Sequence, residues 1–195
     1  MLNSKKKGFS LLEIMVVISI MTILMMAAIS SFSFYYKTFA ETRLINLQKM
    51  IEFSVIRARA DGTTVIICAA TPDSFDSVGK LIPSRFVCSN SQSWGDDPIV
   101  AFESKNGEAT YVDVDDEIIA NLPQGHGGHL YISLLGSPSY MRINPNGFMA
   151  TRNGNIVFCD KTNKYQAALI TNLVGRVIYT DSPTKAGTSD PYECV

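Results

Sequence analysis

Hydrophobic residues form an almost continuous run near the N-terminus, over residues 11–29. One acid, Glu13, and two hydroxyl residues, Ser19 and Thr22, are the only polar interruptions in this run. Three consecutive lysines and a glycine come just before it, at residues 5–8. A membrane-spanning helix needs roughly 20 apolar residues, and flanking cations mark its cytoplasmic end. The pattern therefore predicts a membrane-spanning helix over residues 9–29.

The apolar pattern continues beyond the run with the period of a helix. Apolar residues recur at steps of three and four, and residues 9–61 contain neither Gly nor Pro. The core-facing candidates are Leu44, Leu47, Ile51, Val55 and Ala58. Gly62 then provides a helix stop. We expect one helix over residues 9–60, with its second half packed on a soluble domain.

From residue 61 onward the pattern changes to short β-type runs separated by turn residues. The predicted strands cover residues 64–68, 98–102, 109–114, 130–133, 140–143, 156–159, 165–171 and 176–179. A long irregular connection over residues 71–98 carries the single tryptophan, and neighbouring runs are expected to pair as consecutive hairpins. The pattern predicts an α+β fold in which the long N-terminal helix packs against one face of a β-sheet.

Glu13 is the feature that a simple anchor does not explain. A secretory signal peptide fits badly, because its cleavage site should follow the apolar region, whereas Gly8 precedes it. An ordinary membrane anchor gains nothing from an acid, which costs roughly 2.5–3.5 kcal/mol inside a span. The plain alternative is an acid tolerated near the membrane edge.

The sequence Gly-Phe-Ser-Leu-Leu-Glu over residues 8–13 resembles the class III signal of type IV pilins and type II secretion pseudopilins. The resemblance implies that prepilin peptidase removes residues 1–8 by cutting between Gly8 and Phe9. Phe9 then becomes the N-methylated first residue. Glu13 matches the acid that meets the N-terminal amine of a neighbouring subunit during assembly. An ammonium group would stabilise such a carboxylate in an apolar environment.

The β-rich region, residues 61–195, resembles the GspH/FimT family of minor pilins and pseudopilins, and FimU-type members most. The resemblance covers roughly residues 60–180. It rests on residues 65–68, 143–148, 156–159, 168–170 and 175–177, with Cys88 and Trp94. It implies the type IV pilin fold, in which a long N-terminal helix packs on antiparallel β-sheet layers. It also implies a minor pilin that primes pilus assembly. The implied partners are prepilin peptidase, other minor pilins, the major pilin and the inner-membrane assembly platform. The implied location is the inner membrane, by a single pass, with the β domain in the periplasm until it enters the pilus.

Two other functions are compatible with the same signal. One is that of an H-type minor pseudopilin of type II secretion, and the other is DNA binding in natural transformation, as in FimT-like members. Those members carry a Gly-Arg-any-Arg motif, but here Ile178 follows where the second arginine would stand, so Arg176 alone is a candidate DNA contact. The net charge is −1, and removal of the leader, with its three lysines and no acid, would make it about −4. This charge disfavours nonspecific nucleic-acid binding.

Four cysteines, at residues 68, 88, 159 and 194, allow three pairings. Their spacing is not typical of a zinc site, and export would favour disulfides. We predict Cys68–Cys88 and Cys159–Cys194, because each pair closes a loop of moderate length and the second fixes the C-terminal tail.

The candidates for metal binding and catalysis are weak. His126 and His129 lie in a glycine-rich segment that we interpret as a solvated loop. Four acids, Asp113, Asp115, Asp116 and Glu117, lack the spacing of a calcium loop, which favours an exposed acidic turn. No phosphate-binding loop or nucleophile motif occurs in the sequence. We therefore expect no enzymatic activity, no cofactor and no metal.

Overall fold

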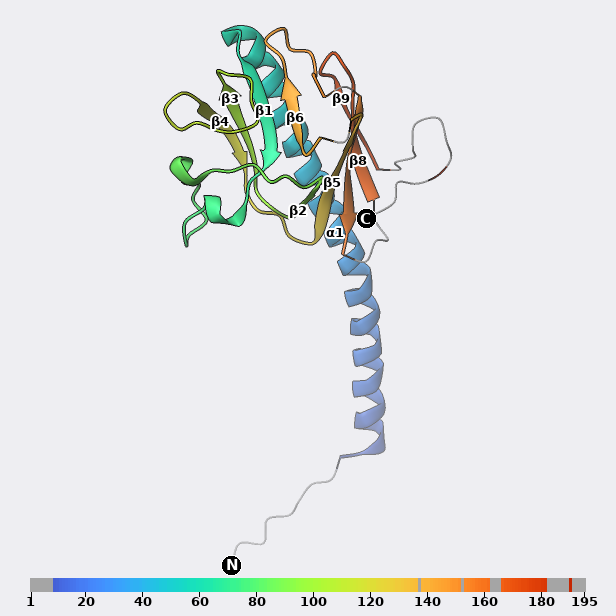
Figure 1. Cartoon of the computed structure of the whole chain (residues 1–195). Helices are drawn as coiled ribbons and strands as arrows, with labels where there is room; N and C mark the ends of the chain where they lie inside the picture. The colour runs from blue at the N-terminus through green and yellow to red at the C-terminus, as the bar shows by residue number, and fades with distance from the viewer. Residues whose placement is uncertain (1–8, 137, 152, 162–165, 182–189, 191–195) are drawn as a thin grey trace, which may run out of the picture.

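The computed structural model describes residues 9–136, 138–151, 153–161, 166–181 and 190. It has a long helix, α1, whose first half projects as a stalk from a β-rich domain and whose second half packs against that domain (Figure 1). The predicted α+β class is confirmed.

Helix α1 runs from Leu11 to Asp61 without interruption, close to the predicted bounds. Its 51 residues extend for about 76 Å at the usual rise per residue. The helix ends at Gly62, which adopts the left-handed conformation with a φ of 65°. Gly tolerates this conformation because it has no Cβ, so the predicted stop has a direct backbone cause.

Two antiparallel sheets make up the domain. In spatial order, the first contains β4 (Glu117–Leu122), β3 (Ile99–Ser104), β1 (Thr64–Ala69) and β6 (Tyr140–Ile143). The second contains β2 (Ser93–Gly95), β5 (Gly128–Leu134), β7 (Gly154–Asp160), β8 (Gln166–Thr171) and β9 (Val177–Thr180). Both sheets contact α1, so the helix lies against two layers.

The prediction of consecutive hairpins is wrong for the middle of the chain. Strands β5 and β6 do not pair, although a turn-like segment joins them. Strand β5 pairs with β7, whereas β6 pairs with β1 and places Met141 opposite Ile67. The final hairpin of β8 and β9 does form as predicted, around the turn at Gly175. The partners of β5 and β6 depend on which face of each strand is buried in the assembled sheets. The local sequence pattern does not carry this information.

The predicted strand over residues 109–114 is also wrong. This segment is a loop between β3 and β4, and Tyr111 packs edge-on against Phe86 and Phe102. Asp116 accepts hydrogen bonds from the backbone N–H groups of Lys105 and Val112, at 3.0 and 2.8 Å. These interactions hold the loop without strand pairing, and the strand begins only at Glu117.

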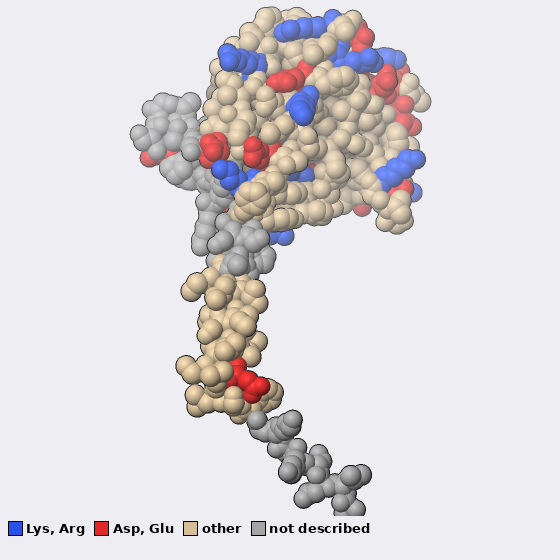
Figure 2. Space-filling view, turned by 180° about the vertical axis from the view of Figure 1, so that it is seen from behind, with Lys and Arg blue, Asp and Glu red and all other residues tan. Residues whose placement is uncertain are grey.

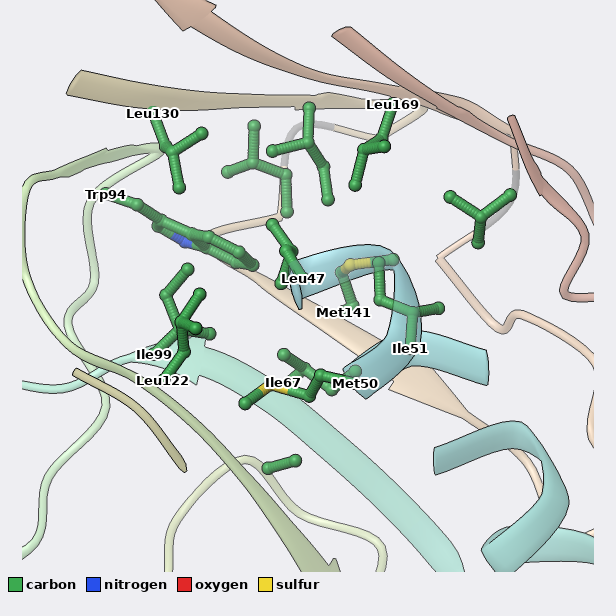
Figure 3. Close-up of a cluster of buried hydrophobic side chains, with 14 of the residues drawn as sticks. Leu47, Met50, Ile51, Ile67, Trp94, Ile99, Leu122, Leu130, Met141 and Leu169 are labelled. Atoms are coloured by element: carbon green, nitrogen blue, oxygen red, sulfur yellow. The ribbon is translucent and has the colours of Figure 1, made fainter. Parts of the chain in front are cut away.

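The main core lies between α1 and both sheets. The predicted apolar face of the helix is buried there, and Trp94 of β2 fills the space below β5 (Figure 3). The Trp94 indole is fully buried, and its Nε1–H donates to the carbonyl of Ser139 at 2.8 Å. A buried indole N–H needs such a partner. Because Ser139 directly precedes β6, this bond also holds the start of that strand in place.

A second core covers the outer face of the first sheet. Ile66 and Cys68 of β1 point away from the helix and pack with Phe86 and Phe102. The predicted Cys68–Cys88 disulfide is confirmed, and it ties the connection between β1 and β2 across this face. That connection contains two short 3₁₀ helices, η1 (Pro72–Ser74) and η2 (Pro83–Arg85). Strand β1 is therefore buried on both faces.

Only one cysteine of the second predicted disulfide, Cys159, lies among the described residues. No free cysteine occurs among the described residues. Cys159 is buried on β7, and its predicted partner, Cys194, lies outside the described residues.

Candidate functional site: the exposed half of the N-terminal helix

Ser10 and Glu13 form a reciprocal cap at the start of α1. The backbone N–H of Glu13 donates to Ser10 Oγ at 3.2 Å, and the backbone N–H of Ser10 donates to Glu13 Oε2 at 3.0 Å. This arrangement is a capping box, which satisfies two N–H groups that otherwise lack partners at a helix start. The carboxylate also lies at the positive end of the helix dipole. Glu13 is thus fixed close to the backbone of its own N-terminus.

Phe9 lies next to this cap with 84 % of its surface exposed, and Gly8 lies outside the described residues. Cleavage between these two residues would turn the amide nitrogen of Phe9 into an ammonium group. Any such ammonium would belong to a chain end that is otherwise apolar. Glu13 is the only acid in residues 9–36, and its carboxylate lies at this same end of the helix.

The next four turns of the helix expose apolar side chains around the whole circumference. Their exposed fractions range from 48 % at Val16 to 78 % at Leu11. The members of this surface, which we call the stalk, are the residues 11–26, all of which are exposed. In Figure 2 the lower part of the helix is tan apart from one acidic group, in agreement with Glu13 as the only charged residue from 9 to 36.

The hydroxyl groups on the stalk are already satisfied. Ser19 Oγ donates to the carbonyl of Met15, and Thr22 Oγ1 donates to the carbonyl of Ser19, each at 2.8 Å. Burial of these residues against another helix or in lipid would therefore leave no hydroxyl donor unpaired. Exposed apolar patches of this extent mark membrane or protein contacts. The stalk is thus suited to lateral packing with apolar helices.

The described residues include no helix segment whose length and hydropathy suffice to span a membrane.

Two arginines on α1 attach the helix to the domain. Arg57 Nε lies 2.7 Å from Glu103 Oε1 of β3 and 2.8 Å from Asp61 Oδ2. The hydrogen bond to Glu103, followed by the negative charges of Glu103 and Asp61, raises the pKa of Arg57. The apolar pattern of the helix did not single out either arginine.

Arg43 is the buried member of the pair. Only 5 % of it is exposed, and it donates to the carbonyls of Pro123 and Asp97 at 3.1 and 2.8 Å. Burial lowers the pKa of Arg43 to about 10, against the opposing effect of Asp96 and Asp97. Gly125 packs on its guanidinium, and a Cβ there would overlap with Arg43 Nη1. The sequence did contain a signal for the burial of Arg43. This residue follows Ala40 by three positions and so falls on the apolar stripe of the helix.

The other sequence candidates do not converge on a site. His126 is exposed and His129 half-buried, and no group of three metal-ligating residues occurs in the described part of the chain. Asp113, Asp115 and Glu117 are exposed as predicted. Asp116 is buried instead, because it caps the loop described above.

Arg176 is exposed just before β9. Its backbone N–H donates to Asn172 Oδ1 at 2.9 Å, which closes the turn of the last hairpin. Ile178, at the position of the missing second arginine, is also exposed. The last hairpin therefore presents the cation Arg176 beside three exposed aliphatic side chains, Leu173, Val174 and Ile178.

Comparisons with known proteins find one match for the N-terminal segment and another for the fold. Residues 3–29 match the prokaryotic N-terminal methylation motif, the class of N-terminal segment found on prepilin-type proteins. The fold is that of a type IV pilin. A crystal structure of the type IV minor pilin FimU from Pseudomonas aeruginosa PAO1 superposes with a TM-score of 0.50 and 13 % sequence identity, covering 75 % of this chain and 92 % of FimU.

A second crystal form of FimU gives a TM-score of 0.46 and 12 % identity, covering 72 % of this chain and 91 % of that one. A search of curated proteins gives no match. The likeness to FimU concerns the fold, and the methylation motif concerns the N-terminal segment.

Proposed function

We propose that this chain is a minor pilin that primes assembly of a type IV pilus. One observation carries the proposal: the methylation motif over residues 3–29 includes the exposed apolar stalk, and this stalk belongs to a pilin-type fold. The motif supplies a processing signal, the stalk supplies a surface for lateral packing, and the β domain remains outside that packing.

In this proposal prepilin peptidase cuts between Gly8 and Phe9, and Phe9 is N-methylated. The inner membrane holds the stalk before assembly, with the β domain in the periplasm. The stalk then packs beside the helices of other minor pilins and the major pilin at the assembly platform. Glu13 accepts the N-terminal ammonium of a neighbour, which offsets the cost of burying each charge alone.

Glu13→Ala tests this role. We expect the variant protein to accumulate in membranes at the level of the unmodified protein, while its amount in sheared pili falls by about tenfold or more, which corresponds to a loss of about 1.4 kcal/mol of subunit pairing. Glu41→Ala is the matched control, because Glu41 is an exposed acid on the same helix outside the stalk. Equal incorporation of Glu13→Ala and Glu41→Ala into pili would rule out the pairing.

An H-type pseudopilin would use the same motif and fold, so the same strains should be assayed for type II secretion. A secretion defect with normal pilus numbers would replace the pilus assignment by the pseudopilin one. The DNA-binding alternative has less support, because the last hairpin presents Arg176 next to an exposed Ile178.

A further inference from the structure

A cavity of about 430 Å³ lies between the β1–β2 connection and the adjoining ends of β3 and β4. Its walls come from η1 and the turn that follows, from Asp97 and Pro98 before β3, and from the segment 121–124 at the end of β4. This part of the connection projects beside β3 and β4 in Figure 1. The volume lies in the range of ligand pockets, and it is separate from the stalk.

The walls of this cavity are held by interactions that do not depend on a ligand. Buried Arg43 donates to the carbonyls of Asp97 and Pro123, and so holds in place the two wall segments that contain these residues. Asp76 Oδ1 accepts the backbone N–H groups of Val78 and Lys80, which shapes the turn after η1. The disulfide from Cys68 anchors the far end of the same connection. The cavity is therefore preformed, which lowers the cost of binding.

The charged side chains of the lining are all acidic, and its neutral polar side chains are those of Ser77, Asn121 and Gln124. Three prolines, Pro72, Pro98 and Pro123, contribute apolar surface and no backbone N–H. The carboxylates of Asp76 and Asp97 also line the cavity, and no lysine or arginine is among the described lining residues. An occupant that combines an aliphatic stem with several hydrogen-bond donors fits this set, as an arginine side chain does.

Asp97 is the group that an incoming cation would satisfy. It is half-buried, and burial, followed by the charge of Asp96, raises its pKa in spite of the opposing charge of Arg43. The described hydrogen bonds of Arg43 end on main-chain carbonyls, including that of Asp97, and not on the carboxylate. The exposed cation nearest in sequence, Lys80, belongs to the turn beside the cavity and is not part of the lining.

We propose that this cavity binds an arginine side chain presented by a neighbouring pilin-type subunit, with Asp97 as the carboxylate that receives the guanidinium. The source of the arginine rests on the proposed function, whereas the chemistry of the cavity does not. The cavity would then add a specific contact between β domains to the packing of the stalks.

The test uses the full-length protein in detergent micelles, with methyl-labelled leucines observed by NMR. Leu122 lines the cavity, and Leu130 lies in the main core as an internal reference. The probe is N-acetyl-arginine N-methylamide, and the control ligand is its neutral isostere, N-acetyl-citrulline N-methylamide. We expect the arginine probe to shift the Leu122 methyl signals saturably, and the citrulline probe to leave them unchanged.

Asp97→Asn should raise the dissociation constant of the arginine probe by about tenfold, because the neutral amide keeps the size but loses the charge. This variant retains the backbone carbonyl to which Arg43 donates. Asp113→Asn, which removes an exposed acid from a different loop, should leave the constant unchanged.

Equal shifts with arginine and citrulline probes, or equal binding by the Asp97→Asn and unmodified proteins, would overturn the proposal. The ligand comparison needs only the unmodified chain, so it decides even if a variant fails to fold. Neither result depends on pili, so a failure here is distinguishable from a failure of Glu13→Ala to affect assembly.

Discussion

At the scale of single residues, the cations of α1 divide into solvent-facing and structural ones. Arg43 occupies a position where the helical period calls for an apolar side chain, and the domain accommodates it with two carbonyl acceptors and a glycine. The sequence carries the spacing that puts Arg43 in the core. It does not show which carbonyls receive the guanidinium, because these come from loops more than 50 residues away.

Replacing Arg43 with Met should lower the free energy of unfolding by about 3 kcal/mol, because two charge-assisted hydrogen bonds to part-buried carbonyls are lost. Fluorescence of Trp94, the single and fully buried tryptophan, reports unfolding in denaturant. Arg59→Met is the control, since Arg59 is exposed and donates only to the carbonyl of Asn146 among its described bonds. We expect the control to change stability by less than about 1 kcal/mol. Equal effects of the two substitutions would contradict the role of Arg43.

Asp97 gives a prediction with a definite pH dependence. Its pKa is raised in the folded state by burial, so ionisation opposes folding, and stability falls as the pH rises above the ordinary Asp value. Asp97→Asn should therefore stabilise the protein at neutral pH, by about a few tenths of a kcal/mol because solvent partly screens this half-buried group. The difference between the two proteins should shrink when both are measured below pH 3.8. A difference independent of pH would contradict this explanation.

At the scale of elements, the helix was predictable and the pairing of strands was not. The helix depends on local signals: no Gly or Pro inside it, Gly62 at its end, and an apolar stripe along it. Most strands were also located by their local composition. The assignment of β5 and β6 to different sheets instead depends on contacts between distant segments, such as Met141 with Ile67. Short β2 was missed because three residues carry no alternating pattern, although Trp94 indicated burial.

The start of α1 offers a test of the cap. Ser10→Ala should reduce the local stability of the first helical turn by about 1 kcal/mol, because the N–H of Glu13 loses its acceptor. Amide hydrogen exchange of residues 11–13 in micelles measures this effect. Ser10→Thr, which keeps the hydroxyl, should restore most of the protection. Unchanged exchange in Ser10→Ala would show that the capping box does not persist in solution.

At the scale of the whole molecule, the chain separates two tasks along one helix. The second half of α1 completes the core of the domain, whereas every residue of the stalk is exposed, with apolar side chains on all sides of the helix. The sequence indicated this division by the change from a continuous apolar run to a periodic one. It could not indicate the cavity beside β3 and β4, since this arises only when three distant loops meet.

The most direct test of the central claim is the intact mass of the protein recovered from sheared pili of the native organism. We predict a chain that begins at Phe9, lacks residues 1–8 and carries one added methyl group at its N-terminus. A Gly8→Ala variant serves as the control and should keep its leader and stay out of the pili. Recovery of the native protein only from membranes, with Met1 or Leu2 at its N-terminus, would contradict the proposal that this chain is a processed pilus subunit.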